Sequence, residues 1–326
     1  MVGLLVHLVT RFAKNMAKDL EDSSDYIVPL NMNGLEGRLL KLPPASPKKH
    51  REILLVYGHH ASIERLLPMA QYLSKYGPVS LPDLPGVGGM EAFYKIGQKP
   101  SIDNMADYLA SFIKLRYKNK RFTLIAMSLG FSIVTRMLQR HPSLAKQVDL
   151  LVSVVGFVHK DDFRWKRRNF VALLTISRFF SRRLPAAFAK RAILNKPVIT
   201  SLYRLAEKKH PKFKGANDIQ RDERIAYEIN LWKINEFRTY ADLAVSMMTM
   251  NLCAERVDLK VYHIAVADDH YFDNIKVEQH LRLIYKDVEL VETVLPAHMP
   301  TMLASEEEVA PLIPPKIRQL LNRDPG

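Results

Sequence analysis

Short apolar runs alternate with helical patterns along most of this chain, and this alternation constrains its fold more than any other feature. Residues 52–57 (EILLVY) form a buried run, and residues 62–76 repeat apolar positions at helical spacing. Strands that alternate with helices are typical of a parallel sheet covered by helices on both faces. Further strands are expected at residues 26–30, 38–42, 78–81, 122–126, 148–155, 259–266 and 288–295, and helices at residues 102–117, 129–139, 274–285 and 306–321.

The alternation stops between about residues 156 and 252, where the pattern is mostly helical. We interpret this stretch as a helical cap inserted between two strands of the sheet. The expected organisation is an N-terminal amphipathic helix at residues 1–25, a core at residues 26–156 and 253–326, and a basic cap at residues 157–252.

Positive charge gathers in this cap. The chain has 48 Lys and Arg against 34 Asp and Glu, a formal net charge of +14. Residues 160–214 hold sixteen of the basic residues and three acidic ones, so the rest of the chain is close to neutral. Phe and Leu are interleaved with the basic residues, which favours an anionic membrane surface or a lipid ester over a nucleic-acid partner. The plainer interpretation is a cap whose apolar face covers the active site and whose basic face is solvated, and contact with a membrane or lipid is its alternative.

The first twenty residues repeat Val, Leu and Phe at helical spacing, which predicts a helix that packs on the protein or lies at a membrane interface. No run reaches the roughly 18 apolar residues of a membrane span, and no basic residue precedes the apolar start as in a signal peptide. The single cysteine, Cys253, excludes an internal disulfide. These features predict a cytoplasmic protein, free or peripheral to a membrane.

One serine stands between an expected strand and an expected helix. The segment Ala126-Met-Ser128-Leu-Gly130 separates the apolar run FTLIA from the helical pattern FSIVTRML. This is the place of a nucleophile elbow, in which small residues two before and two after the serine let the backbone pass closely. The usual first residue is Gly, and Ala126 is a small substitute. The context predicts that Ser128 is a nucleophile.

A hydroxyl nucleophile needs a base, and the base needs an orienting acid. Asp269 follows the expected strand at residues 259–266 and precedes the pair Tyr271-Phe272, which favours it as the acid. Asp268 is the close alternative, and Asp161 or Asp162 after the preceding strand is another. His298 follows the next expected strand, in a loop with the sequence PAHMP, and is the expected base.

Two backbone N–H groups are expected to bind an oxyanion. The run EILLVY leads into Gly58-His59-His60, so the N–H of His59 and that of Leu129 form the expected pair. The His59-His60 doublet also suggests a metal site. We discount that interpretation because no H-x-x-E or C-x-x-C pattern stands nearby.

Together these motifs resemble the α/β-hydrolase superfamily, in its capped esterase and lipase-like branch. The resemblance covers roughly residues 35–322. It rests on the Ser128 elbow, on Asp269 and His298, on the oxyanion loop from Tyr57 to His60, and on the turn from Asp83 to Gly88 (DLPGVG). Tyr57 and Ala126 depart from the usual His and Gly of the family.

The resemblance implies a serine hydrolase that cleaves carboxylic esters through an acyl-enzyme, without a metal or organic cofactor. Lactonase, C–C hydrolase and acyltransferase activities use the same triad and remain open. A non-catalytic, membrane-associated binding protein on the same fold is an alternative from another class, although such a protein would not need an ordered triad.

Overall fold

A central eight-stranded sheet organises the computed structural model, which describes residues 25–206, 218–267, 269–293 and 309–323. The strands lie in the order β1-β2-β4-β3-β5-β6-β7-β8. The six strands from β4 to β8 pair in parallel, whereas β1 and β2 add an antiparallel hairpin at one edge. The predicted α/β fold with a mostly parallel sheet is therefore confirmed. The strands are β1 (Ile27–Met32), β2 (Leu35–Leu42), β3 (Ile53–Val56), β4 (Val79–Pro82), β5 (Phe122–Met127), β6 (Val148–Val154), β7 (Val257–Ile264) and β8 (Tyr285–Val291).

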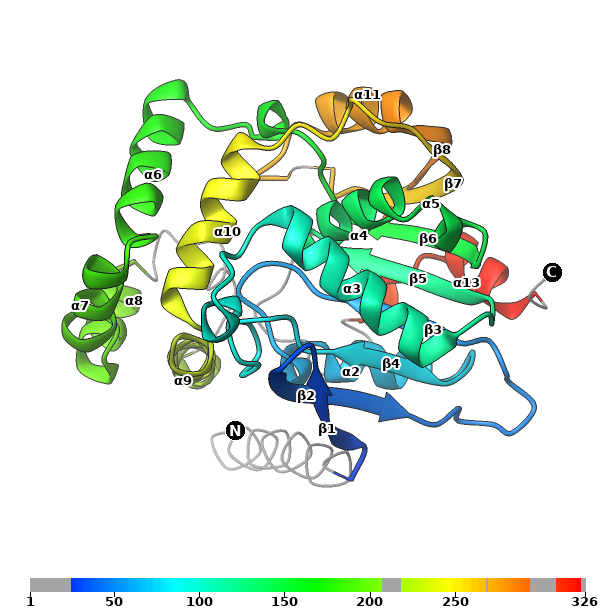
Figure 1. Cartoon of the computed structure of the whole chain (residues 1–326), viewed down its shortest axis with the longest axis horizontal. Coiled ribbons are helices and arrows are strands. Elements are labelled where there is room, and N and C mark those ends of the chain that lie inside the picture. Colours follow the sequence, from blue (N-terminus) through cyan, green and yellow to red (C-terminus); the bar gives the residue numbers. More distant parts are fainter. Residues whose placement is uncertain (1–24, 207–217, 268, 294–308, 324–326) are drawn as a thin grey trace, which may run out of the picture.

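Helices cover both faces of this sheet (Figure 1). Helices α3 (Ile102–Tyr117) and α4 (Leu129–Arg140) lie side by side on one face, and α2 (Ile63–Leu73) and α13 (Pro315–Asn322) lie on the other. The shorter α5 (Pro142–Ala145) follows α4, and α11 (Asn274–Ile284) packs on the edge strand β8. Short 3-10 turns occur at η1 (Phe93–Ile96), η2 (Lys160–Asp162) and η4 (Ala310–Leu312).

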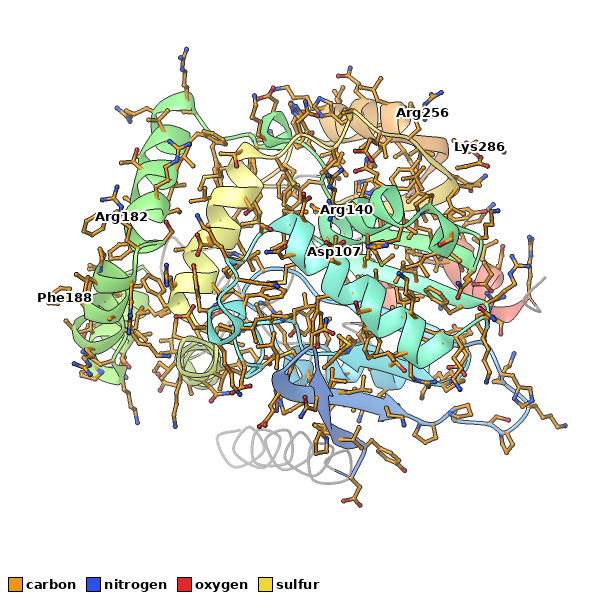
Figure 2. All side chains as sticks on the ribbon, in the orientation of Figure 1. Asp107, Arg140, Arg182, Phe188, Arg256 and Lys286 are labelled. Carbon is orange, nitrogen blue, oxygen red and sulfur yellow. The ribbon has the colours of Figure 1, made fainter. Side chains whose placement is uncertain are left out.

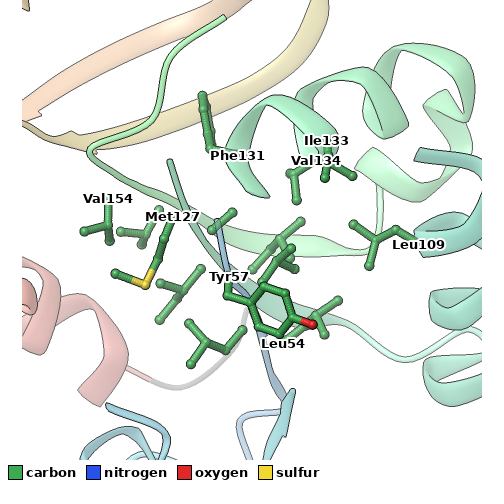
Figure 3. Packing of buried hydrophobic residues seen from close by; sticks show 14 of the residues in the cluster. Leu54, Tyr57, Leu109, Met127, Phe131, Ile133, Val134 and Val154 are labelled. Carbon is green, nitrogen blue, oxygen red and sulfur yellow. The ribbon is translucent and has the colours of Figure 1, made fainter. Parts of the chain in front are cut away.

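The core is built from the central strands, whose side chains are buried on both faces of the sheet. All six residues of β5 are buried, which explains why its sequence is apolar except for Thr123. Figure 3 shows Leu54 and Met127, which belong to neighbouring strands, packed among residues of the covering helices such as Leu109 and Ile133. This packing sets the position of the strand ends from which the candidate site is built.

In the described residues between β6 and β7, five α-helices form a layer beyond the sheet (Figure 1). Helix α10 packs against α6 and α7, and α8 packs against α9. Within the described ranges no helix is long and apolar enough to cross a membrane. The five helices are α6 (Arg167–Phe180), α7 (Arg183–Ala192), α8 (Lys196–Ala206), α9 (Asp218–Ile234) and α10 (Phe237–Thr249).

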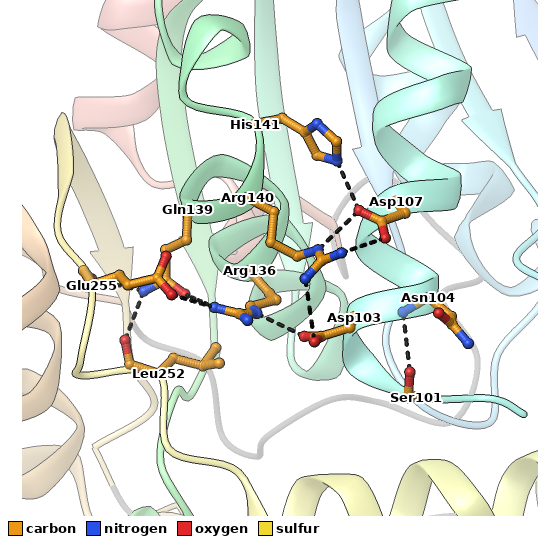
Figure 4. Close-up of polar contacts among 10 residues, drawn as sticks. All are labelled: Ser101, Asp103, Asn104, Asp107, Arg136, Gln139, Arg140, His141, Leu252 and Glu255. Atoms are coloured by element: carbon orange, nitrogen blue, oxygen red, sulfur yellow. Dashed lines mark hydrogen bonds and ion pairs between the residues drawn. The ribbon is translucent and has the colours of Figure 1, made fainter.

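Polar side chains anchor the C-terminal half of α4 (Figure 4). Arg136 Nε donates to Asp103 Oδ1 of α3 at 2.7 Å, and Arg140 binds Asp107 through two hydrogen bonds of 2.9 and 2.7 Å. The buried amide of Gln139 donates to the carbonyl oxygens of Leu252 (2.7 Å) and Glu255 (2.8 Å). Helix α4 is thereby tied both to α3 and to the segment that returns from the cap to β7.

Most elements differ from their expected bounds by a few residues, as β2 does by beginning at Leu35, and two elements differ in a way that the structure explains. The expected helix at residues 306–321 is, in its described part, the turn η4 followed by α13. Pro314 and Pro315 separate the two, because proline lacks the N–H that would continue the first turn but suits the start of a helix. Strand β8 begins at Tyr285, directly after α11, because Tyr285 pairs with Val257 of β7. Of the expected N-terminal helix, residues 1–24 lie outside the described residues.

Candidate active site

Ser128 occupies the turn that joins β5 to α4. Its backbone has φ 48° and ψ −123°, a conformation that non-glycine residues rarely adopt. Its N–H donates to the carbonyl oxygen of Val154 at the end of β6 (3.0 Å), which holds the turn against the neighbouring strand. This strained strand-to-helix turn is the geometry of a nucleophile elbow, and strain of this kind concentrates at functional sites.

Two glycines allow the backbone to pass close to this turn. A Cβ atom at Gly130 would lie 2.3 Å from the carbonyl oxygen of Tyr57, closer than any real contact. A Cβ atom at Gly58 would lie 2.9 Å from Cβ of Ser128 and 3.5 Å from the backbone nitrogen of Leu129. The loop after β3 therefore runs directly beside the serine and the start of α4. Ala126 is completely buried within β5.

The loop after β3 and the start of α4 hold the two backbone N–H groups, of His59 and Leu129, that are expected to bind an oxyanion. Leu129 is the first residue of α4, so its N–H has no acceptor inside the helix and lies at the positive end of the helix dipole. His59 lies in the loop that passes Ser128, and its Nε2 donates to the carbonyl oxygen of Tyr240 in the cap (3.0 Å). The ring of His59 also stacks on that of Tyr240 with centroids 4.1 Å apart. Removal from water and the neighbouring His60 lower the pKa of His59, so the ring is neutral.

Tyr57, one of the two departures from the family pattern, joins two of the motifs. Its buried hydroxyl donates to Asp83 Oδ1 (3.1 Å) and accepts from the N–H of Leu84 (2.7 Å). Asp83 in turn accepts from Arg38 Nε at 2.9 Å. Gly88 is required in this turn, because its φ is +69° and a Cβ atom would lie 2.0 Å from Asp83 Oδ1. The phenol thus ties the end of β3 to the glycine-rich turn after β4.

Asp269 is almost completely buried beyond the C-terminal end of β7, with 2% of its surface exposed. Its Oδ1 accepts from the backbone N–H groups of Tyr271 (2.7 Å) and Phe272 (3.2 Å). The apolar pair that singled out Asp269 in the sequence therefore supplies the donors that orient its carboxylate.

Asp269 and Ser128 follow strands that end at the same edge of the sheet. Ala126 of β5, Ser153 of β6 and His263 of β7 are paired in register across three parallel strands. Ser128 lies two residues beyond Ala126, and Asp269 lies six residues beyond His263. Functional groups of open parallel sheets gather at the carboxyl ends of their strands. His263 itself is buried with its Nδ1 2.9 Å from Ser153 Oγ, and burial lowers its pKa to about 4.

The alternative acids have different surroundings. Asp162 is fully buried, and its Oδ2 accepts from the N–H groups of Val158 and His159, both at 2.9 Å. His280 Nδ1 lies 2.5 Å from its Oδ1. These contacts use both oxygens of Asp162 to hold the chain where it enters the cap. Asp161 is exposed beside Lys160. Asp268 and the expected base His298 both lie outside the described residues.

One buried polar contact between the cap and the loop after β3 was not anticipated from the sequence. Glu228 of α9 is completely buried, and its Oε2 lies 3.4 Å from His60 Nε2 and 2.9 Å from the hydroxyl of Tyr203 in α8. His60 has φ +55° and its ring lies against Trp232. A lone glutamate within a helical stretch carries no sequence signal, since only the packing of the cap brings it to the oxyanion loop.

Comparisons with known proteins identify the fold. No protein-family model matches the chain, and no curated protein matches it in sequence. Among solved structures, a membrane phospholipase A described as a bacterial virulence factor is 15% identical, with a TM-score of 0.62, over 98% of this chain and 96% of that one.

Two further structures resemble more than four fifths of the chain. MGS-M2, an alpha/beta hydrolase from a Medee basin deep-sea metagenome library, is 12% identical with a TM-score of 0.59, covering 83% of this chain and 90% of that one. An esterase from Exiguobacterium antarcticum is 14% identical with a TM-score of 0.59, over 82% and 90%. The sheet order, the elbow at Ser128 and these likenesses together give the chain the fold of the α/β-hydrolase superfamily.

Proposed function

We propose that this protein is a serine hydrolase that cleaves carboxylic esters through an acyl-enzyme intermediate. The observation that carries the proposal is the backbone of Ser128, which is held at φ 48° on a turn flanked by the close approaches of Gly58 and Gly130. Lys118 and Val155 share a positive φ, but Ser128 combines it with a hydroxyl group, the start of a helix and two close backbone approaches, which together form the geometry of a nucleophile elbow.

In the proposed mechanism Ser128 Oγ attacks the ester carbonyl carbon while His298 accepts its proton. The carbonyl oxygen becomes an oxyanion, for which the N–H groups of His59 and Leu129 are the proposed donors. Asp269 orients His298 and stabilises its charged form. When the intermediate collapses, His298 returns the proton to the departing alcohol and leaves the acyl group on Ser128. Water then attacks the acyl-enzyme with His298 as the base, which releases the carboxylic acid and restores Ser128.

Two observations support this assignment of roles. The carboxylate of Asp269 is buried and oriented by two backbone N–H groups, as an acid that fixes a base would need. The named activities of two structural neighbours, a phospholipase and an esterase, are both ester hydrolyses. We assign the same reaction class to this chain, with a small-molecule or lipid ester as the substrate.

Labelling with a fluorophosphonate probe tests the proposal, because such probes react with activated serines. The wild-type protein should be labelled at Ser128, the variant Ser128→Ala should not be labelled, and the variant of the exposed Ser143, Ser143→Ala, should be labelled as the wild type. A panel of 4-nitrophenyl esters from acetate to palmitate should show turnover that is lost in Ser128→Ala. Labelling that persists in Ser128→Ala, or a folded wild-type protein that hydrolyses no ester and takes no label, would overturn the proposal.

The same panel separates ester hydrolysis from the related reactions. A lactone substrate tests for lactonase activity, and an added alcohol that captures the acyl group tests for acyltransferase activity. Each of these would retain labelling at Ser128 but change the preferred acyl donor or acceptor. A non-catalytic binding protein would show neither labelling nor turnover.

A further inference from the structure

The outer side of the cap exposes an unusual amount of apolar surface. Among the residues that the structure describes, nine of the fourteen large apolar side chains that are strongly exposed lie between Val171 and Leu205. Leu184 is 81% exposed and Phe188 is 67% exposed. Exposed patches of this kind mark binding surfaces, whereas single exposed apolar residues need no explanation.

These side chains lie on helices whose other faces already have partners. In α7, Ala186 and Ala189 are buried, so Leu184 and Phe188 project on the opposite side. In α6, Phe170 and Leu174 pack against the core cluster, while Ile176 and Phe179 are each 52% exposed. Figure 2 shows Arg182 and Phe188 on the side of these helices that faces away from the sheet. We call this solvent-facing side of α6, α7 and α8 the outer cap face.

The outer cap face is also uniformly basic. Residues 163–206 contain eleven Lys and Arg and no Asp or Glu. In the described part of the chain, the ion pair from Arg204 to Asp222 (3.7 Å) is the single one formed by a basic residue of α6, α7 or α8, and both partners are largely exposed. Within the described residues, the basic side chains of α6 and α7 therefore form no ion pair with the protein itself. An anionic partner would balance their charge.

We propose that the outer cap face is a docking surface for anionic lipid bilayers. Exposed Leu, Ile and Phe enter the boundary between headgroups and acyl chains, while the Arg and Lys between them contact the anionic headgroups. The protein then lies on the membrane with its cap towards the lipid, without spanning the bilayer. This proposal rests on the cap alone and stands independently of the chemistry proposed for Ser128.

The composition of the face favours lipid over other partners. A second copy of the same face would bring like charges together, which opposes self-association. Single-stranded nucleic acids are bound by aromatic stacking platforms, and paired phosphates by polar, basic surfaces. Aliphatic side chains such as Leu184 and Ile176 offer neither, but they gain free energy by leaving water for an acyl layer.

Co-sedimentation of the full chain with vesicles tests this proposal. The vesicles contain phosphatidylcholine alone or phosphatidylcholine with 30–40% phosphatidylglycerol, at about 0.05 to 1 M salt, over which range the Debye length falls from more than 10 Å to about 3 Å. The wild-type protein should bind the anionic vesicles and lose binding as salt increases. A charge variant replaces five basic residues of the face by Gln: Arg178, Arg182, Arg183, Lys190 and Arg191.

The charge variant should lose at least about tenfold in partition coefficient on anionic vesicles, because each basic residue near such a surface adds to the attraction. Its control changes five exposed lysines outside the cap to Gln and should bind as the wild type: Lys41, Lys48, Lys114, Lys146 and Lys286. Equal losses in both variants would overturn the proposal, because net charge alone would then explain binding.

An apolar variant tests the contribution of the exposed apolar side chains to vesicle binding. It replaces Ile176, Phe179, Leu184 and Phe188 by Ser, and should weaken vesicle binding about tenfold or more even at low salt. Its control replaces Leu115, Ile275, Leu283 and Leu290, which are exposed elsewhere, and should bind normally. Both variants should show the circular dichroism spectrum and the cooperative thermal unfolding of the wild type, which shows that they are folded.

Four further outcomes would overturn the proposal. Wild-type protein that binds neutral and anionic vesicles equally would remove the role of charge. Binding that survives in both the charge and the apolar variant would assign it to another part of the chain. Tighter binding of the wild type to single-stranded RNA than to anionic vesicles, or an oligomeric state that only the apolar variant changes, would assign the face to nucleic acid or to a second copy.

Discussion

His60 Nε2 and Glu228 Oε2 lie 3.4 Å apart and join the loop after β3 to helix α9 of the cap. Asn235 Nδ2 lies 3.4 Å from the other ring nitrogen, so Nδ1 of His60 accepts there and Nε2 faces the carboxylate. His60 directly follows His59, whose N–H is a proposed oxyanion donor. The cap therefore contacts the loop on which the proposed chemistry depends.

Removal of the Glu228 carboxylate should disturb both the stability and the catalytic rate. Glu228→Ala removes a buried acceptor from neutral donors, which costs about 1–3 kcal/mol for each hydrogen bond that is lost. Glu228→Gln keeps the shape and should cost less, while lowering kcat more than it changes KM. Urea unfolding and ester kinetics measure the two effects. A double-mutant cycle with His60→Gln should show a coupling energy above about 0.5 kcal/mol, and additive effects would contradict the contact.

Asp269 and Asp162 should respond differently to the same substitution. Asp269→Asn should lower kcat by about 10³- to 10⁴-fold with little change in stability, because an amide fixes the wrong tautomer of the base. Asp162→Asn should mainly reduce stability, since its oxygens accept from Val158, His159 and His280. Kinetics together with thermal unfolding separate the two. A reversed pattern would move the acid to Asp162.

The backbone passes so close to Ser128 that adding one methyl group should have different effects at Gly130 and at Gly58. Gly130→Ala should unfold or strongly destabilise the protein, because the new Cβ would lie 2.3 Å from backbone oxygen, which cannot move aside cheaply. Gly58→Ala should instead displace Ser128, whose Cβ would lie 2.9 Å away, and so reduce kcat by at least about tenfold in a folded protein.

Gly97→Ala provides the control for these two variants. Gly97 also has a positive φ of +72°, but its Cβ would meet nothing within 4 Å. It should therefore show only the cost of backbone strain, about 1–2 kcal/mol, with normal kinetics. Full activity of Gly58→Ala would mean that the loop does not press on the serine in solution.

His263 should make the protein less stable in acid. Burial lowers its folded-state pKa from 6.5 to about 4, so the folded protein keeps the ring neutral while the unfolded chain binds a proton. The contribution of His263 to stability is therefore complete above about pH 6.5 and is lost as the pH falls towards 4. Across that window the free energy of unfolding should fall by about 1.4 kcal/mol for each pH unit because of His263.

Urea unfolding at pH 7, 6 and 5 measures this slope, and the variant His263→Gln isolates it. Burial raises the pKa of Asp83 to about 7, which acts in the opposite direction, but this contribution is common to both proteins and cancels in their difference. The difference in unfolding free energy between wild type and variant should shrink as the pH falls. A difference that is constant over this range would contradict a buried neutral His263.

Most of the sheet could be predicted because its signals are local. The fully buried strand β5 and the helix α4 after it keep nearly the expected bounds, since a continuous apolar run followed by helical spacing leaves few alternatives. The strained turn at Ser128 was predictable for the same reason, because small residues flank it within a few positions. The start of β8 was missed, since pairing with Val257 decided it.

The sequence by itself determined the succession of strands and helices along the chain, the place of Ser128 between a strand and a helix, and the gathering of basic residues in the cap. Each of these is a property of residues that are close together in the sequence. Only the tertiary structure decided that Asp162 accepts hydrogen bonds from backbone N–H groups where the chain enters the cap, and that Glu228 lies beside His60. It also decided which apolar residues of the cap stay exposed. These features depend on contacts between segments far apart in the chain. Their free energies come from how whole helices pack, which no short stretch of sequence encodes.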